Sequence, residues 1–342
     1  MGIREIANRA KVSTATVSRT INGVKTVAPY LAKRVWKAVE EVGYFPDTHA
    51  RALVSGRSRV FGLIVSEITN PFFPEIVQVF EDIAVENDYE ILLSSTVHDP
   101  ERMKLSVRRM IQRRVEGVAI MTFGMEDSLL SDLKFRKIPL VFVDVGPALP
   151  LVSNIRVDYR NGLRQAVQHL AALRHTQIAF VSGPLNLKSA AARKTAFLDS
   201  MKEVGLKVRP EFLIEGDHTL QGGMAALQRL VQTSPRPTAI VCSNDMTGIG
   251  VMRKSYEQGI RIPHDLSVIG FDDIRLAQFV TPPLTTVQMS QAELARVAFH
   301  ALLADVRREK PVPHGSEYTL NTSLVLRDST ALAPVHASAA VS

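Results

Sequence analysis

Polar side chains that could hold a small molecule follow several apolar runs of this 342-residue sequence, at the points where those runs end. Asn70 comes shortly after VFGLIVS, Asp144 ends PLVFVD, and Asp272 ends LSVIGFD. Asn244 follows TAIVCS, and Arg193 lies in the helical stretch after QIAFVS. Carboxylates, an amide and a guanidinium around one gap form a set that suits the binding of vicinal hydroxyl groups. The pattern therefore predicts a site for a small polar molecule.

These side chains need a frame that brings them together. From residue 60 onward, short apolar runs alternate with stretches of helical periodicity such as 72–88. Such alternation is typical of a parallel sheet that is covered by helices on both faces. The series occurs twice, and ligands of such sheets bind beyond the carboxyl ends of the strands. We therefore expect an α/β body of two doubly wound parallel-sheet lobes, with the site in the cleft between them.

The order of the runs predicts where the chain crosses between the lobes. Asn154–Tyr159 is expected to be the first crossing, with Asp158 capping the helix that opens the second lobe. The alanine-rich segment 331–342 is expected to be a disordered tail. Lobe 1 should comprise about 60–158 and 289–322, and lobe 2 about 159–288 and 323–330, within an effector-binding and dimerisation domain of residues 60–330.

The first sixth of the chain differs from the rest in charge. Residues 1–57 carry ten Lys or Arg and four Asp or Glu, so this segment holds +6 of the chain's net charge of +7. A compact basic segment on a nearly neutral body favours a polyanionic partner such as double-stranded DNA. A solvated basic surface without a partner is the alternative.

Three short helical patterns fit within residues 1–46. The first two are joined by about three residues, which is the spacing of a helix-turn-helix whose second helix enters a major groove. Ser13 is a suitable N-cap for that second helix, and Gly43 ends the third. The expected DNA contacts are Thr14 and Ala15 to base edges, Arg19 to guanine or a phosphate, and Ser13, Thr16 and Asn22 to phosphates.

The run VSTATVSRTING, followed by EEVGYFPDTHARALVSGRS, resembles the DNA-binding head and hinge of the LacI/GalR family of bacterial regulators. The resemblance covers nearly the whole chain through NPFF, VDV, SGPLNLKSAAAR, SNDMTGIG, VIGFDD and PPLTTV. It implies a periplasmic-binding-protein-like body and a regulator, expected to be a repressor, whose operator affinity depends on a small effector. It also implies that Asp144, Arg193, Asn244 and Asp272 line the effector pocket.

By the same resemblance, residues 47–59 form a hinge helix and linker. A helix of about two turns is marginal alone in water, so the hinge is expected to form only when two copies pair on DNA. Leu53 would then wedge between base pairs in the minor groove, and Ala50 would let the paired helices approach closely. An ordinary linker is the alternative, which the neighbouring head disfavours.

Three departures from the family pattern deserve note. Lys11 stands in the turn where the family usually has Gly, and Ala28 stands where a capping Ser is common. Sugar-binding relatives often stack the ring on a tryptophan, and the matching residue here is His218. We expect His218 or Phe72 to supply a flat wall for the ligand in place of the tryptophan. Lys188, near Arg193, is compatible with an acidic or phosphorylated sugar. The predicted effector is therefore a sugar or sugar derivative.

Enzymatic activity is disfavoured because the sequence has no GxSxG elbow, P-loop or HExxH motif. Gly248-Ile-Gly250 is only half of a dinucleotide fingerprint, and Asp272 with Asp273 has no nearby histidine to complete a metal site. The single cysteine, Cys242, excludes a disulfide within the chain and a cysteine-based zinc site. We expect no catalytic residue, cofactor or metal.

The remaining expectations concern partners and compartment. No apolar run approaches the length of a membrane span, and the N-terminal segment MGIREIANRAKV does not read as a signal peptide. We expect a cytoplasmic homodimer on a palindromic operator, with a dimer favoured over a tetramer and helix 72–88 among the contacting elements. The alternative is a periplasmic-type sugar-binding protein, which shares the two-lobe body. The basic head disfavours this alternative.

Overall fold

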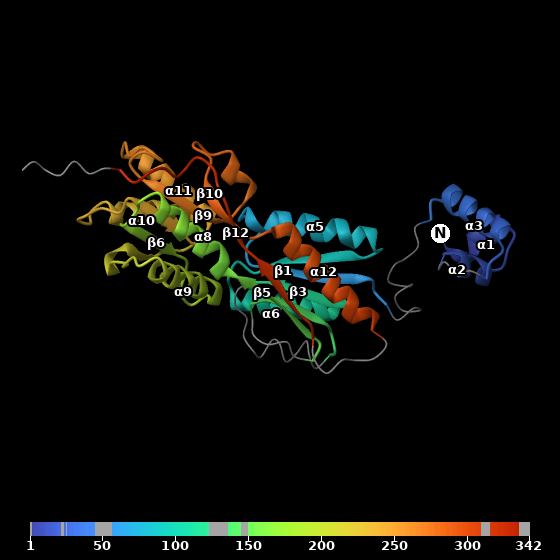
Figure 1. Ribbon diagram of the computed structural model, residues 1–342. Coiled ribbons are helices and arrows are strands. Elements are labelled where there is room, and N and C mark those ends of the chain that lie inside the picture. The colour runs from blue at the N-terminus through green and yellow to red at the C-terminus, as the bar shows by residue number, and fades with distance from the viewer. Residues whose placement is uncertain are drawn as a thin grey trace, which may run out of the picture. The chain divides into compact units, whose positions relative to one another are not determined.

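The computed structural model describes residues 2–21, 24, 26–44, 57–122, 136–144, 150–308 and 315–334. The chain separates into two compact units, Met1–Arg59 and Val60–Ser342. We call the first unit the head and the second the body, and describe each by itself (Figure 1).

The head is a three-helix unit around a small apolar core. Its core contains Ile6, Val17 and Val35, each fully buried. The prediction that Ser13 caps the second helix is confirmed, because Ser13 Oγ accepts from the amide of Thr16 at 3.1 Å. The helices are α1 (Ile3–Ala10), α2 (Thr14–Ile21) and α3 (Pro29–Val42).

The family departures in the head have visible backbone consequences. Lys11 ends α1 in the left-handed region with φ 49°, where glycine would be free of Cβ strain. Ala28 precedes α3 and provides no side-chain cap, while Pro29 occupies the first turn. Gly43 ends α3 at φ 63° as predicted. The head therefore tolerates one strained turn, and both α1 and α3 begin without a side-chain cap.

Lobe 1 of the body contains a parallel sheet of strand order β11-β5-β4-β3-β1-β2. Phe61, Leu63 and Val65 of β1 pack on the side of α5, whereas Ile64 packs on the side of α6. The strands are β1 (Val60–Val65), β2 (Glu90–Ser95), β3 (Gly117–Met121), β4 (Leu140–Val143), β5 (Val152–Asp158) and β11 (Glu317–Asn321). The helices are α5 (Phe72–Glu86) and α12 (Gln291–Arg307) on one face and α6 (Pro100–Gln112) on the other.

Lobe 2 has the same plan, with strand order β12-β10-β9-β8-β6-β7. Only β12 runs antiparallel to its neighbour, β10. The strands are β6 (Ile178–Ser182), β7 (Leu213–Glu215), β8 (Ala239–Cys242), β9 (Ser267–Asp272), β10 (Thr285–Gln288) and β12 (Ser323–Val325). The helices are α8 (Tyr159–Ala172), α9 (Lys188–Glu203), α10 (Leu220–Leu230) and α11 (Asp245–Glu257), with 3₁₀ turns η1 (Pro210–Phe212) and η2 (Arg275–Gln278).

Three chain crossings join the lobes, between β5 and α8, between β10 and α12, and between β11 and β12. Asp158 caps α8 as predicted, since its carboxylate accepts from the amide of Asn161 at 3.1 Å. Residues 154–158, predicted as a connection, belong instead to strand β5 and pair with β4 and β11. Thr322, in the third crossing, contacts the first turn of α8, which follows the first crossing. Its hydroxyl accepts a hydrogen bond from the amide of Gly162 at 3.0 Å.

The prediction of a disordered tail from residue 331 onward is wrong for its first four residues. A ring nitrogen of His175 lies 2.9 Å from the carbonyl oxygen of Ala331, and the amide of Ala333 donates to the carbonyl of Leu173 at 2.8 Å. These contacts hold the segment on lobe 2. Residues 335–342 lie outside the described residues.

Candidate functional site

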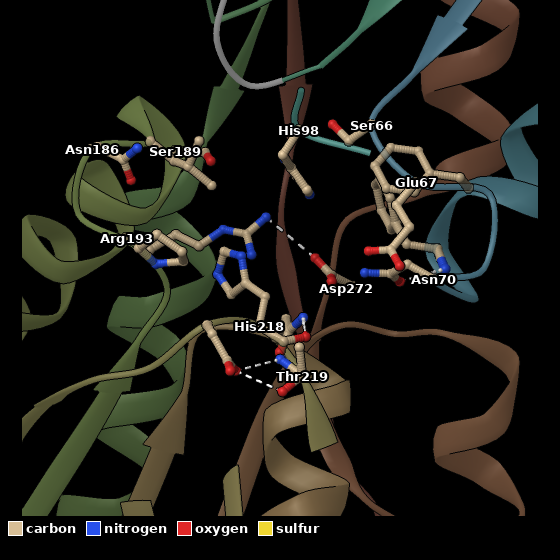
Figure 2. Close-up of a pocket in the computed structure, with 16 residues that line it drawn as sticks. Ser66, Glu67, Asn70, His98, Asn186, Ser189, Arg193, His218, Thr219 and Asp272 are labelled. Carbon is tan, nitrogen blue, oxygen red and sulfur yellow. Dashed lines mark hydrogen bonds and ion pairs between the residues drawn. The ribbon is translucent and has the colours of Figure 1, made fainter. Parts of the chain in front are cut away.

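A cavity of about 330 Å³ lies between the two lobes, at the carboxyl ends of their strands (Figure 2). Its lobe 1 wall follows β1 and β2, and its lobe 2 wall follows β6, β7, β8 and β9. The cavity is lined by six of the seven residues predicted to bind the effector: Asn70, Phe72, Arg193, His218, Asn244 and Asp272.

Arg193 of α9 forms the cationic centre of the lobe 2 wall. It is only 4% exposed, and its Nη2 lies 3.2 Å from Asp272 Oδ1. Its Nη1 donates to the carbonyl of Ser243, and its guanidinium lies 4.0 Å from the ring centre of Phe271. Among the described residues, Arg193 Nε and Asp272 Oδ1 have no hydrogen-bond partner. Since buried polar groups are normally bonded, hydrogen-bonding capacity is left beside the cavity at these two atoms.

Asp272 ends β9 with φ 110°, a left-handed backbone that L residues rarely adopt. Burial raises the pKa of its carboxyl to about 7, against the opposing effect of the Arg193 charge. Its carbonyl accepts from the side-chain amide of Gln291 at 2.8 Å, at the start of α12. The residue therefore joins the cavity to the second crossing.

His218 follows β7 at φ 65° and faces the cavity from lobe 2. Burial, assisted by the Arg193 charge, lowers the pKa of its imidazole to about 3, so the ring is neutral near pH 7. One ring nitrogen lies 2.9 Å from Ser243 Oγ. The residue thus provides a flat, uncharged wall on the lobe 2 side of the cavity.

Asn244 is the N-cap of α11, where its Oδ1 accepts from the amide of Thr247 at 2.9 Å. Its Nδ2 donates to the carbonyl of His218 at 3.0 Å. One N–H of the amide is left for a ligand, because a side-chain amide has two. The helix N-terminus therefore fixes this group at the cavity.

Most of the lobe 1 wall comes from the loop after β1 and the first turn of α5, and His98 joins it from the loop after β2. Asn70 Oδ1 accepts from the amide of Phe72 at 3.1 Å, which leaves its NH₂ group without a partner among the described residues. Phe72 is 3% exposed and meets Phe73 edge to face. Ser66 Oγ is buried and has no hydrogen-bond partner in the described part of the chain.

Asp144 is the one predicted effector residue that does not line the cavity. Its Oδ1 accepts from the amide of Val157 at 2.9 Å, and its Oδ2 accepts from the hydroxyl of Tyr159 at 2.6 Å. Burial raises the pKa of this carboxyl despite those bonds. Because Tyr159 opens α8 and its ring lies 5.2 Å from the Arg193 guanidinium carbon, Asp144 is linked to the cavity through the first crossing.

Sequence reasoning missed several lining residues, among them Ser66, Glu67, His98 and Ser189. The strand-end rule that found Asn70 applies equally to Ser66 and Glu67, which follow β1 directly. His98 comes three residues after the end of β2. Ser189 shares α9 with Arg193, at a spacing of four residues.

On the head, α2 exposes the residues predicted to read DNA. Thr14, Ala15 and Arg19 are exposed, and Arg19 forms no ion pair with any described residue. The Ser13 and Thr16 hydroxyls lie 2.9 Å apart at the start of the helix. Three predicted contact residues lie outside the described residues: Asn22, Ala50 and Leu53.

Comparison with known proteins connects these two regions. Residues 2–47 match the family of bacterial regulatory proteins of the lacI type, and residues 167–330 match the periplasmic binding protein-like domain. The HTH-type transcriptional repressor PurR of Aliivibrio salmonicida is 32% identical over 306 residues, which cover 89% of this chain and 92% of that protein. The chain belongs to the LacI family.

Solved structures extend the similarity to the fold. A Lac repressor dimer bound to operator and the anti-inducer ONPF matches with a TM-score of 0.86 and 27% identity, covering 97% of this chain and 99% of that chain. The complex of the transcriptional regulator CelR with cellobiose matches with a TM-score of 0.72 and 26% identity, covering 96% and 99%. The predicted fold and the assignment as a DNA-binding transcriptional regulator, not an enzyme, are thereby confirmed.

Three further observations concern metal binding, membrane-spanning helices and the single cysteine. Among the described ranges, no group of three His, Cys, Asp or Glu side chains could hold a metal ion. No described helix combines the length and the apolar character that crossing a membrane requires. Cys242 is buried in β8, and burial raises the pKa of its thiol, as expected of a core residue.

Proposed function

We propose that this LacI-family chain is a repressor whose operator affinity is set by a sugar or sugar derivative bound in the interlobe cavity. The observation that carries the proposal is the buried Arg193–Asp272 ion pair, which lines the cavity and in which, among the described residues, Arg193 Nε and Asp272 Oδ1 have no hydrogen-bond partner. A hydroxyl group both donates and accepts, so neighbouring hydroxyls of one ligand can satisfy both atoms.

The other walls of the cavity fit the same chemistry. The neutral ring of His218 and the ring of Phe72 supply flat apolar contacts, and the amides of Asn70 and Asn244 supply donors. The CelR neighbour holds cellobiose, and a LacI-family regulator from Enterococcus faecium holds ribose. These ligands support a carbohydrate-derived effector here. We propose Asn70, Phe72, Arg193, His218, Asn244 and Asp272 as its contacts.

We further propose that the chain acts in the cytoplasm as a homodimer on a palindromic operator. Thr14 and Ala15 would contact base edges, Arg19 would contact a guanine or a phosphate, and Ser13, Thr16 and Asn22 would contact phosphates. Ala50 and Leu53 would belong to a hinge helix that pairs across the dimer and bends the DNA. Effector binding in the cavity would change the angle between the lobes. The paired hinge helices would form or melt in response to that change.

Selection from random-sequence DNA tests the DNA-binding part. We expect the chain to enrich a two-fold symmetric site, and Arg19→Ala to lose about tenfold or more of its preference for the matching base pair. Arg229→Ala, at an exposed position of α10, is the matched control and should bind like the parent. A periplasmic-type binding protein would enrich no sequence, and that outcome would overturn the proposal.

Thermal-shift screening tests the effector. The panel holds sugars, sugar acids, sugar phosphates and nucleobases, because Lys188 at the start of α9 favours an anionic ligand and the rings of His218 and Phe72 favour a planar one. A carbohydrate that stabilises the parent chain but not Arg193→Ala supports the proposal. Stabilisation by nucleobases alone would reject the carbohydrate class.

A further inference from the structure

The lining of the interlobe cavity carries more negative than positive charge. Among the described residues it contains the guanidinium of Arg193 and the carboxylates of Glu67, Asp217 and Asp272. Arg193 lies 3.2 Å from Asp272 and pairs with it. The other two carboxylates form no ion pair with any described residue. Because a cleft with one sign of charge attracts ligands of the opposite sign, the lining favours a cation over an anion.

Glu67 is the carboxylate that a ligand meets farthest from bulk water. It follows β1 in lobe 1 and is partly buried, whereas Asp217 of lobe 2 is exposed. Glu67 Oε1 accepts a hydrogen bond from the hydroxyl of Thr69 at 2.7 Å, and its Oε2 accepts none from any described residue. The threonine therefore orients the carboxylate and leaves its second oxygen for another donor.

Ser66, the neighbour of Glu67, is an independent sign of a ligand group at this place. It lines the cavity and is only 1% exposed. Its Oγ has no hydrogen-bond partner among the described residues, although buried hydroxyl groups are normally bonded. A hydroxyl oxygen accepts as well as donates, so a donor that reaches Glu67 from within the cavity can bond to Ser66 too.

An ammonium group fits these two residues better than a hydroxyl group does. It carries three N–H donors and no acceptor, and both residues present acceptor oxygens. A ligand that fills the cavity also displaces water from Glu67. A carboxylate that loses its water is costly unless a positive charge compensates it, and a neutral hydroxyl does not supply that charge. Charge compensation therefore selects the ammonium.

We propose that the effector is an amino sugar whose ammonium group binds Glu67 and Ser66. Its hydroxyl groups bind the Arg193–Asp272 pair. The inference rests on the proposed function, because it assigns the class of the sugar that fills the same cavity. Figure 2 shows Ser66 and Glu67 on the lobe 1 side of the cavity and Arg193 on the lobe 2 side. Lobe 2 thus orients the sugar, and lobe 1 adds selection for its charge when the lobes close.

The same arrangement disfavours sugar acids and sugar phosphates. Their anionic groups would share the cavity with Glu67 and Asp217, and like charges repel most where water is excluded. Lys188 is exposed on α9 and does not line the cavity, so its charge acts only through solvent. Of the two lining histidines, His218 is neutral near pH 7 and His98 is exposed. No lining cation other than Arg193 is therefore buried among the described residues.

Calorimetry of the full-length chain near pH 7 tests the class of ligand with matched sugars. Glucosamine is compared with glucose, galactosamine with galactose, and mannosamine with mannose, since each pair differs only in one amino group that replaces a hydroxyl. We expect at least one amino sugar to bind about tenfold or more tightly than its neutral partner. Gluconate and glucose 6-phosphate should bind more weakly than glucose.

Glu67→Gln tests the residue, because it keeps the acceptor of the Thr69 bond and removes only the charge. This variant should bind the amino sugar and its neutral partner with dissociation constants within about twofold of each other. Glu75→Gln, at an exposed position of α5 outside the lining, is the matched control and should keep the preference of the parent.

The outcomes separate this inference from the proposed function. Neutral sugars that bind as tightly as their amino partners in every pair would overturn the amino-sugar class and leave a carbohydrate effector in place. A preference for the amino sugar that survives Glu67→Gln would overturn the role of Glu67 in the same way. A parent chain that binds no sugar of the panel, charged or neutral, would overturn both proposals.

Discussion

The two walls of the interlobe cavity are built differently. In lobe 2 the lining groups bond across elements: Arg193 of α9 reaches Asp272 at the end of β9, and His218 after β7 reaches the buried Ser243 after β8. In lobe 1 the polar groups come from the loops after β1 and β2, and Asn70 Oδ1 bonds only the turn in which it lies. We infer that lobe 2 is a preorganised polar surface and that lobe 1 supplies shape and closure.

This difference has a physical consequence for what each wall can lose. A buried charge that loses its partner is costly, because the remaining charge cannot be hydrated. A capping residue at a partly exposed helix start contributes less, since water can replace its bond. Substitutions in lobe 2 should therefore affect stability and ligand binding more than substitutions in lobe 1.

The largest effect is expected from Arg193→Ala. Asp272 would be left buried without its cation, which should lower the free energy of unfolding by about 3–5 kcal/mol. Chemical denaturation of the body at pH 8, where the Asp272 carboxyl is mostly ionised, measures this loss. Arg229→Ala should stay within about 0.5 kcal/mol of the parent. A loss below about 1 kcal/mol for Arg193→Ala would show that the Arg193–Asp272 pair is not the stabilising, preorganised feature of lobe 2 that we infer.

A pH-dependent effect of intermediate size is expected from His218→Gln. The pKa of His218 is lowered from its ordinary 6.5 to about 3, so the folded chain keeps the ring neutral while the unfolded chain protonates it below 6.5. The contribution of His218 to stability is therefore complete above 6.5 and is lost as pH falls toward 3. Between pH 7 and pH 5.5 the parent should lose about 1 kcal/mol relative to the variant. Parallel stability curves for the two proteins over this range would refute the neutral, buried ring.

The smallest effect is expected in the lobe 1 wall. Asn70→Ala removes the side-chain acceptor of the Phe72 amide and should lower the free energy of unfolding by about 1 kcal/mol. Asn70→Asp keeps the acceptor and serves as the control for the cap. Ligand affinity in calorimetry should fall less for Asn70→Ala than for Asn244→Ala. The reverse order would show that lobe 1, and not lobe 2, provides the polar recognition.

The sequence predicted most of the body because its strands are short apolar runs with polar residues at their ends. Asn244 and Asp272 follow such runs directly, so the strand-end rule places them at the cavity. The rule fails for Asp144, since the sequence does not reveal that Tyr159 and Val157 occupy both of its oxygens. Those bonds depend on how the first crossing folds back beside β4.

Two other failures have the same origin in distant contacts. Strand β5, VSNIRVD, contains four polar residues among its seven, so it was predicted as a connection and is recognised as a strand only by its pairing with β4 and β11. The segment at Ala331 looks like a free tail because its anchor, His175, is more than 150 residues away in sequence. Local patterns predict elements, whereas these pairings arise only in the folded sheet.

The central claim is that occupancy of the interlobe cavity controls operator affinity. Its most direct test is the dissociation constant of the full-length chain for its selected operator, with and without a saturating concentration of the ligand that gives the largest thermal shift. We predict a change of at least tenfold, which requires a preference of about 1.4 kcal/mol for one of the two lobe arrangements. An operator dissociation constant that stays the same while the ligand demonstrably fills the cavity would contradict the account.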